Sequence, residues 1–171
     1  MAMDLDIKKL AGNFGAEVRN INVPEISDSE LKRLCLNLYE HRFLVLRTGG
    51  LTKEEYVTFA RRVGDPIHLS AGKADHPEIA EMSNIDNDSV ATRKGAAHWH
   101  SDQSFRKKVS SVTMLYSVQA PERGGETLFC DMVAAYEALS YSAKEQVEDL
   151  VVEHRHGVSI VARPDDHPPI P

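Results

Sequence analysis

Two helix-start signatures in the first 65 residues constrain the fold more than any other feature of this sequence. Each places a hydroxyl residue three positions before a glutamate, at Ser27 and Glu30 and at Thr52 and Glu55. This is the capping-box pattern, in which each residue of the pair satisfies a free backbone N–H of the first helical turn. Residues 27–41 carry apolar side chains at helical spacing, and residues 52–64 end in glycine. The sequence therefore predicts two helices here.

Short β-type segments surround and follow these helices. Residues 16–23 alternate like a strand, and residues 43–47 are apolar enough for a buried strand. After Pro66 come four further strand candidates separated by turns: 79–85, 111–118, 126–132 and 157–163. One long helical stretch is expected across 132–156, with a third capping box at Ser142 and Glu145. The pattern predicts an α+β fold with a jelly-roll (double-stranded β-helix) core and flanking helices.

The densest group of metal-binding side chains lies in the stretch "GAAHWHSDQSF", residues 95–105. His98, His100 and Asp102 share parity, so on an extended strand they point to one face. Same-face neighbours are about 6.6 Å apart, whereas metal bonds to these side chains are about 2.0 to 2.2 Å long. Without a bend in the backbone, one ion can therefore be shared by only two neighbours.

Two pairings remain open. His98 with His100 would belong to a zinc hydrolase of the metallo-β-lactamase-like type, although Gln103 stands where that motif continues with a histidine. His100 with Asp102 forms the H-x-D half of a two-histidine, one-carboxylate Fe(II) site, which leaves one face of the ion for co-substrate and oxygen. An isolated H-x-D is weak evidence because it occurs by chance in many proteins.

The surrounding motifs favour the second pairing. "WHSDQSF", followed by "APERGGETLF" and "DMVAAYEALS", resembles the taurine dioxygenase-like family of Fe(II)/2-oxoglutarate-dependent dioxygenases, whose pattern is W-H-x-D, then P-x-x-G-G-x-T, then A-Y-x-x-L-S. The matching residues are Trp99, His100 and Asp102, then Pro121, Gly124, Gly125 and Thr127, then Ala135, Tyr136, Leu139 and Ser140. The N-terminal elements are also similar, so the resemblance covers nearly the whole chain as one domain, 1–171.

The resemblance assigns roles to three of these residues. It implies that His100 and Asp102 bind Fe(II), and that the Thr127 hydroxyl helps to bind a carboxylate of the co-substrate 2-oxoglutarate. It also implies hydroxylation of a small organic substrate, often an anion in this family, by molecular oxygen with release of succinate and CO2. On this view His98 is a bystander that does not bind the metal.

The family's second iron-binding histidine and its 2-oxoglutarate-binding arginine lie well downstream of the H-x-D. The chain ends at "ARPDDHPPIP", and its remaining histidines, His154, His156 and His167, are not in the context of that ligand. We therefore expect a domain truncated before its last core strands, with exposed sheet edges that a homo-oligomer would cover. The alternative is a catalytically incomplete homologue that acts as a binding or scaffold protein.

Charge and hydropathy exclude other classes of partner. The net charge is −6, so there is no basic surface that would favour nucleic acid or an anionic membrane. No run approaches the roughly 20 apolar residues of a membrane span, and the N-terminus lacks the apolar core of a signal peptide. We expect a cytoplasmic protein whose partners are a small-molecule substrate and oxygen.

Overall fold

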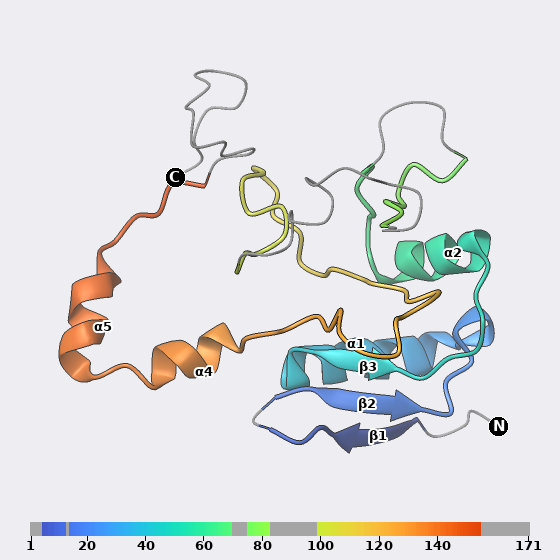
Figure 1. Ribbon diagram of the computed structural model, residues 1–171, viewed down its shortest axis with the longest axis horizontal. Coiled ribbons are helices and arrows are strands. Elements are labelled where there is room, and N and C mark those ends of the chain that lie inside the picture. Colours follow the sequence, from blue (N-terminus) through green and yellow to red (C-terminus); the bar gives the residue numbers. More distant parts are fainter. Residues whose placement is uncertain (1–4, 13, 70–74, 83–98, 155–171) are drawn as a thin grey trace. The chain divides into compact units, whose positions relative to one another are not determined.

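The computed structural model describes residues 5–12, 14–69, 75–82 and 99–154, and the chain divides into two compact units, Met1–Met82 and Ser83–Pro171 (Figure 1). The first unit holds β1 Asp6–Lys9, β2 Ala16–Arg19, the 3-10 helix η1 Val23–Glu25, α1 Asp28–His41, β3 Leu44–Leu46 and α2 Lys53–Val63. The second holds α4 Met132–Glu137 and α5 Tyr141–Glu148. The prediction of a single domain over 1–171 stays a prediction.

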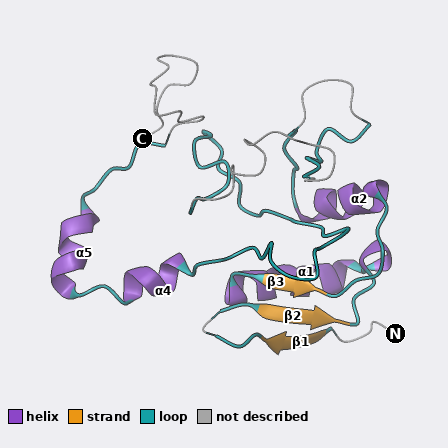
Figure 2. Ribbon diagram, viewed as in Figure 1, coloured by secondary structure: helices purple, strands orange, loops and turns teal. Residues whose placement is uncertain are grey.

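The first unit is built on a three-stranded sheet in the order β1-β2-β3 (Figure 2). The central strand β2 pairs antiparallel with β1, with Ile7 opposite Val18, and parallel with β3, with Val18 opposite Leu46. A parallel pair needs a crossover connection, and α1 provides it between β2 and β3 and packs against β3. The strand prediction at 43–47 is confirmed in its centre and that at 16–23 in its first half, whereas β1 was not predicted.

The two capping boxes predicted in the first 65 residues are present. Ser27 Oγ accepts from the Glu30 N–H while the Ser27 N–H donates to the Glu30 carboxylate at 2.9 Å, and Thr52 and Glu55 repeat this arrangement. α2 ends at Gly64, whose N–H donates to the Ala60 carbonyl. The buried apolar residues of the described chain all belong to this unit: Leu5, Ala16, Val18, Ile21, Val23, Ile26, Leu31, Leu34, Val57 and Phe59.

A buried carboxylate lies on the central strand. Glu17 accepts hydrogen bonds from Arg47 Nε and Arg19 Nε, each at 2.7 Å, and one of its oxygens faces each arginine. The hydrogen bonds from Arg47 and then Arg19 hold the pKa of Glu17 below its ordinary value of 4.5. Charge pairing of this kind makes it tolerable for a carboxylate to be removed from water.

The helical part of the second unit differs from its prediction. The expected single stretch across 132–156 is two short helices, because Asp131 caps α4 and Ser140, accepting from the Ala143 N–H at 3.2 Å, caps α5. The predicted capping box at Ser142 and Glu145 is therefore wrong, because the cap is Ser140 and the third residue of the helix is Ala143. His154 lies beyond the end of α5, not in its last turn, and His156 and His167 lie outside the described residues.

The strand candidates of this unit do not form strands where the structure describes them. Residues 111–118 alternate in burial, since Val112, Met114 and Tyr116 are half-buried while the residues between them are exposed. A strand also needs a hydrogen-bonded neighbour, and neither 111–118 nor 126–132 has a ladder partner in the described part of the chain. Residues 79–82 are described and form no strand. Residues 83–85 and the whole candidate 157–163 lie outside the described residues. Within the described residues the sheet is the mixed one above, and no further strand is added to it.

No helix within the described ranges is long and apolar enough to cross a membrane.

Replacing Thr52 by alanine removes the cap of α2 and leaves its first-turn N–H groups without this acceptor. We expect Thr52→Ala to lower the free energy of unfolding by about 1 kcal/mol, measured by urea denaturation followed by circular dichroism. The matched control is Thr58→Ala, an exposed position inside the same helix. Equal destabilisation by the two changes would contradict a capping role.

The stability of the chain should depend on the charge of Glu17. Because its folded-state pKa lies below 4.5, the ion cluster stabilises the fold above that pH and loses its effect as the pH falls through the folded-state pKa. We expect the free energy of unfolding of the wild type to fall more steeply with acidification below 4.5 than that of Glu17→Gln. Glu25→Gln, which changes an exposed carboxylate outside the cluster, should follow the wild type; a wild-type slope no steeper than that of Glu17→Gln would contradict the prediction.

Candidate functional site

His100 and Asp102, the two predicted metal ligands, lie close together. His100 Nε2 lies 3.2 Å from Asp102 Oδ1, and the two side chains are 52% and 45% exposed. Two donors in neighbouring positions of an octahedral ion, each about 2.1 Å from it, would be about 3.0 Å apart. The donor types and their separation therefore fit a shared divalent cation, with an open side facing solvent.

The backbone reverses immediately after this pair. Gln103 adopts a φ of 57°, a conformation that few residues other than glycine adopt, and its carbonyl accepts from the Arg106 N–H at 3.0 Å. The Gln103 side chain also accepts from Arg106 Nε. Asp102 therefore stands at the entrance of a tight turn, and the chain that leaves this turn can come back toward it.

The returning segment supplies a residue that the sequence did not single out. Thr113 Oγ1 donates to Asp102 Oδ2 at 2.9 Å, so the two carboxylate oxygens have different neighbours. A lone hydroxyl eleven residues from the aspartate forms no recognisable motif.

The other predicted site residues are Thr127 and His98. Thr127 is exposed, and within the described residues no hydrogen bond joins it to His100 or Asp102. It follows the expected glycine turn, where Gly124 and Gly125 have φ values of 79° and 76°. A Cβ on Gly125 would come 3.2 Å from the Pro121 ring, so this turn favours glycine. His98 lies outside the described residues, and within them no three metal-binding side chains form a group.

The A-Y-x-x-L-S segment has a structural role in this fold. Ser140 is the cap of α5, and the Tyr136 ring lies under the Lys144 ammonium at 5.4 Å. Lys144 also donates to the Glu137 carbonyl at 3.0 Å, close to the end of α4. These contacts fix the corner between the two helices.

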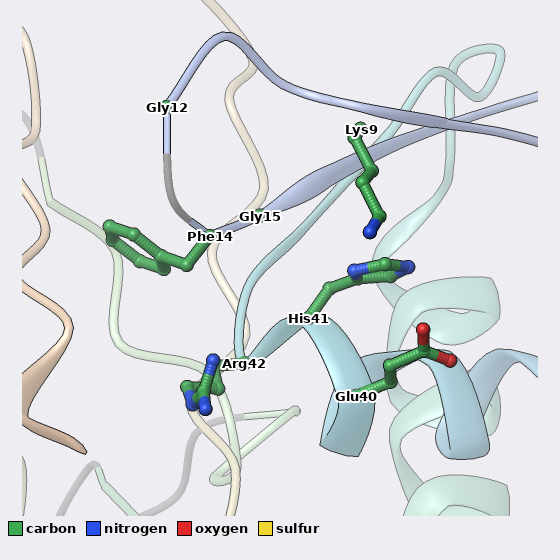
Figure 3. A pocket seen from close by; sticks show the side chains of 7 residues that line it. All are labelled: Lys9, Gly12, Phe14, Gly15, Glu40, His41 and Arg42. Atoms are coloured by element: carbon green, nitrogen blue, oxygen red, sulfur yellow. The ribbon is translucent and has the colours of Figure 1, made fainter. Parts of the chain in front are cut away.

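A cavity of about 230 Å³ lies in the first unit, at the C-terminal end of α1 (Figure 3). Its lining residues are Lys9, Gly12, Phe14, Gly15, Glu40, His41 and Arg42. Lys9, His41 and Glu40 gather on one side of it, and Phe14 and Arg42 on the other. Basic side chains at a helix C-terminus are favoured by the helix dipole. None of the predicted site residues lines the cavity. Its basic side chains are accounted for by their position at the C-terminal end of α1.

This chain is similar to known proteins of one family. The model of a family described as taurine catabolism dioxygenase TauD, TfdA family matches residues 6–170. An alpha-ketoglutarate-dependent 2,4-dichlorophenoxyacetate dioxygenase from Cupriavidus pinatubonensis is 30% identical, over 82% of this chain and 55% of that protein. An (S)-phenoxypropionate/alpha-ketoglutarate-dioxygenase from Sphingobium herbicidovorans is 31% identical, over 90% of this chain and 54% of that protein.

A solved structure has a similar fold. The crystal structure of AAD-2 in complex with Mn(II) and N-oxalylglycine aligns with a TM-score of 0.68 at 26% identity, covering 89% of this chain and 56% of that one. The chain thus spans about half the length of the relatives it matches.

Proposed function

Because this chain belongs to the taurine catabolism dioxygenase TauD, TfdA family, we propose that it carries part of the active site of an Fe(II)- and 2-oxoglutarate-dependent dioxygenase. The observation that carries the proposal is the approach of His100 Nε2 to Asp102 Oδ1 at 3.2 Å, within the family's W-H-x-D motif. One imidazole and one carboxylate are two of the three protein ligands of such an iron site.

The third ligand is supplied from outside the described residues. In the family pattern it is a histidine much further along the sequence, and among the described residues no third metal-binding side chain joins the pair. The bound iron would supply the oxidising chemistry, in which 2-oxoglutarate becomes succinate and CO2 and one oxygen atom enters the substrate. His100 binds as neutral imidazole and Asp102 as carboxylate, which together leave one positive charge to attract an anionic co-substrate.

Thr127 is proposed to bind that co-substrate. An exposed hydroxyl donates to a carboxylate without adding charge, so it can act beside a cationic group. The substrate proposed is a small organic anion. The two relatives above are named for 2,4-dichlorophenoxyacetate and (S)-phenoxypropionate, both aromatic ethers that carry a carboxylate.

The zinc-hydrolase alternative has weaker support. It requires His98 to join His100, and His98 lies outside the described residues. The matched family and the curated relatives are also named as dioxygenases. The alternative of a binding homologue without catalysis is distinguished by the experiment below.

Metal binding tests the proposed ligands directly. In anaerobic titration calorimetry of the full chain with Fe(II), we expect His100→Ala and Asp102→Ala each to weaken binding by about tenfold or more, since even outer partners of ligands contribute about that much. His76→Ala is the matched control, because His76 pairs with Glu54 in the first unit. Wild-type affinity in both site variants would contradict the assignment. Succinate formation that depends on iron and 2-oxoglutarate would exclude the non-catalytic homologue.

The role of Thr127 is tested by 2-oxoglutarate binding in the presence of Mn(II). Loss of one hydrogen bond to a charged group costs about 1.5 to 3 kcal/mol, so Thr127→Val should weaken 2-oxoglutarate binding by about tenfold to a hundredfold. Thr127→Ser keeps the hydroxyl and should bind nearly as the wild type does. Equal affinity of the valine and serine variants would exclude a hydroxyl contact.

A further inference from the structure

The Asp102 carboxylate is held from two sides. Its Oδ1 lies 3.2 Å from His100 Nε2, and its Oδ2 accepts the Thr113 hydroxyl at 2.9 Å. The first neighbour is two residues away and the second is eleven residues away, beyond the turn at Gln103. One oxygen is thus turned toward the predicted metal-binding imidazole while the other is occupied by a donor.

Such a hydrogen bond defines the orientation of a carboxylate. The terminal torsion of aspartate is broad and roughly two-fold, so either oxygen can face a ligand and the plane can rock. A donor on one oxygen removes most of that freedom and leaves the other oxygen as the natural single-atom ligand. Partners that orient ligating side chains in this way commonly contribute to metal affinity. A hydroxyl does so without adding a charge that would oppose the cation.

The local structure favours threonine for this task. In 111–118 the half-buried Val112 and Met114 alternate with exposed residues, so Thr113 projects from the opposite face to its two apolar neighbours. These neighbours hold the segment by partial burial. The β-branched side chain of threonine also restricts χ1, which limits the positions that its hydroxyl can take.

We propose that Thr113 is a positioning residue, whose hydroxyl holds Asp102 Oδ2 so that Oδ1 is presented beside His100 Nε2 to a single divalent cation. The inference rests on the proposed function, because it requires that His100 and Asp102 bind the metal. Thr113 itself does not touch the ion, and its effect is exerted through Asp102.

Co(II) titration of the full chain tests this proposal, with visible absorption reporting the donors around the metal. Thr113→Val keeps the shape of the side chain and removes the donor, and it should weaken Co(II) binding by about tenfold. Thr113→Ser should restore binding to within about threefold of the wild type, since the donor is retained. Ser111→Ala removes an exposed hydroxyl two residues earlier on the same segment and should leave the affinity unchanged. Circular dichroism checks that each variant is folded.

A double-mutant cycle separates positioning from a general structural effect. In the Asp102→Ala background, Thr113→Val should change the Co(II) affinity by less than about twofold, because its partner is gone. An undiminished effect in that background would overturn the proposal. Wild-type affinity of Thr113→Val would also overturn it, and the proposed function would stand if His100→Ala and Asp102→Ala still weakened binding. If neither of these weakened it, the proposed function and this inference would fail together.

Discussion

The first unit depends on the hydrogen-bonding requirement of β2. Ala16, Glu17 and Val18 are buried in succession, so the backbone groups of this strand need partners within the protein. They find them in β1 on one side and β3 on the other, and the parallel direction of β3 requires the crossover through α1. The buried Glu17 adds a second requirement, because its charge needs Arg19, at the end of β2, and Arg47, which follows β3.

The second unit is ordered by local contacts instead. Asp131 and Ser140 cap its helices, and a glycine turn and the turn at Gln103 shape its loops. It also leaves large apolar side chains exposed, among them Val118 and Leu128. The hydrogen bond between Thr113 and Asp102 is important in this unit, because it joins the H-x-D to a segment beyond the turn. The orientation of the proposed ligand depends on that bond more than on a surrounding sheet.

Whether the sequence predicted a feature depended on how far apart in the chain the interacting residues lie. The capping boxes at Ser27 and Thr52 act over three residues, and both were predicted correctly. β1 was missed because a four-residue segment with two lysines becomes a strand only through its pairing with β2. The helix expected across 132–156 failed at Ser140, where a local cap outweighed continued apolar periodicity. The His100 and Asp102 pair was predicted from its motif, whereas Thr113 depends on a turn whose path the sequence does not reveal.

The geometry of the H-x-D also explains why it can provide only part of the proposed metal site. On an extended chain the two positions are about 6.6 Å apart, yet their side chains approach to 3.2 Å because a long imidazole reaches toward a short carboxylate. A third residue of the same parity lies about 13 Å from Asp102 on such a chain, too far to complete the set. One short segment can therefore fix two neighbouring positions of an ion, and every further donor has to arrive on a different part of the chain. The H-x-D would provide two neighbouring ligands, and the fold around it determines whether further ligands complete the site.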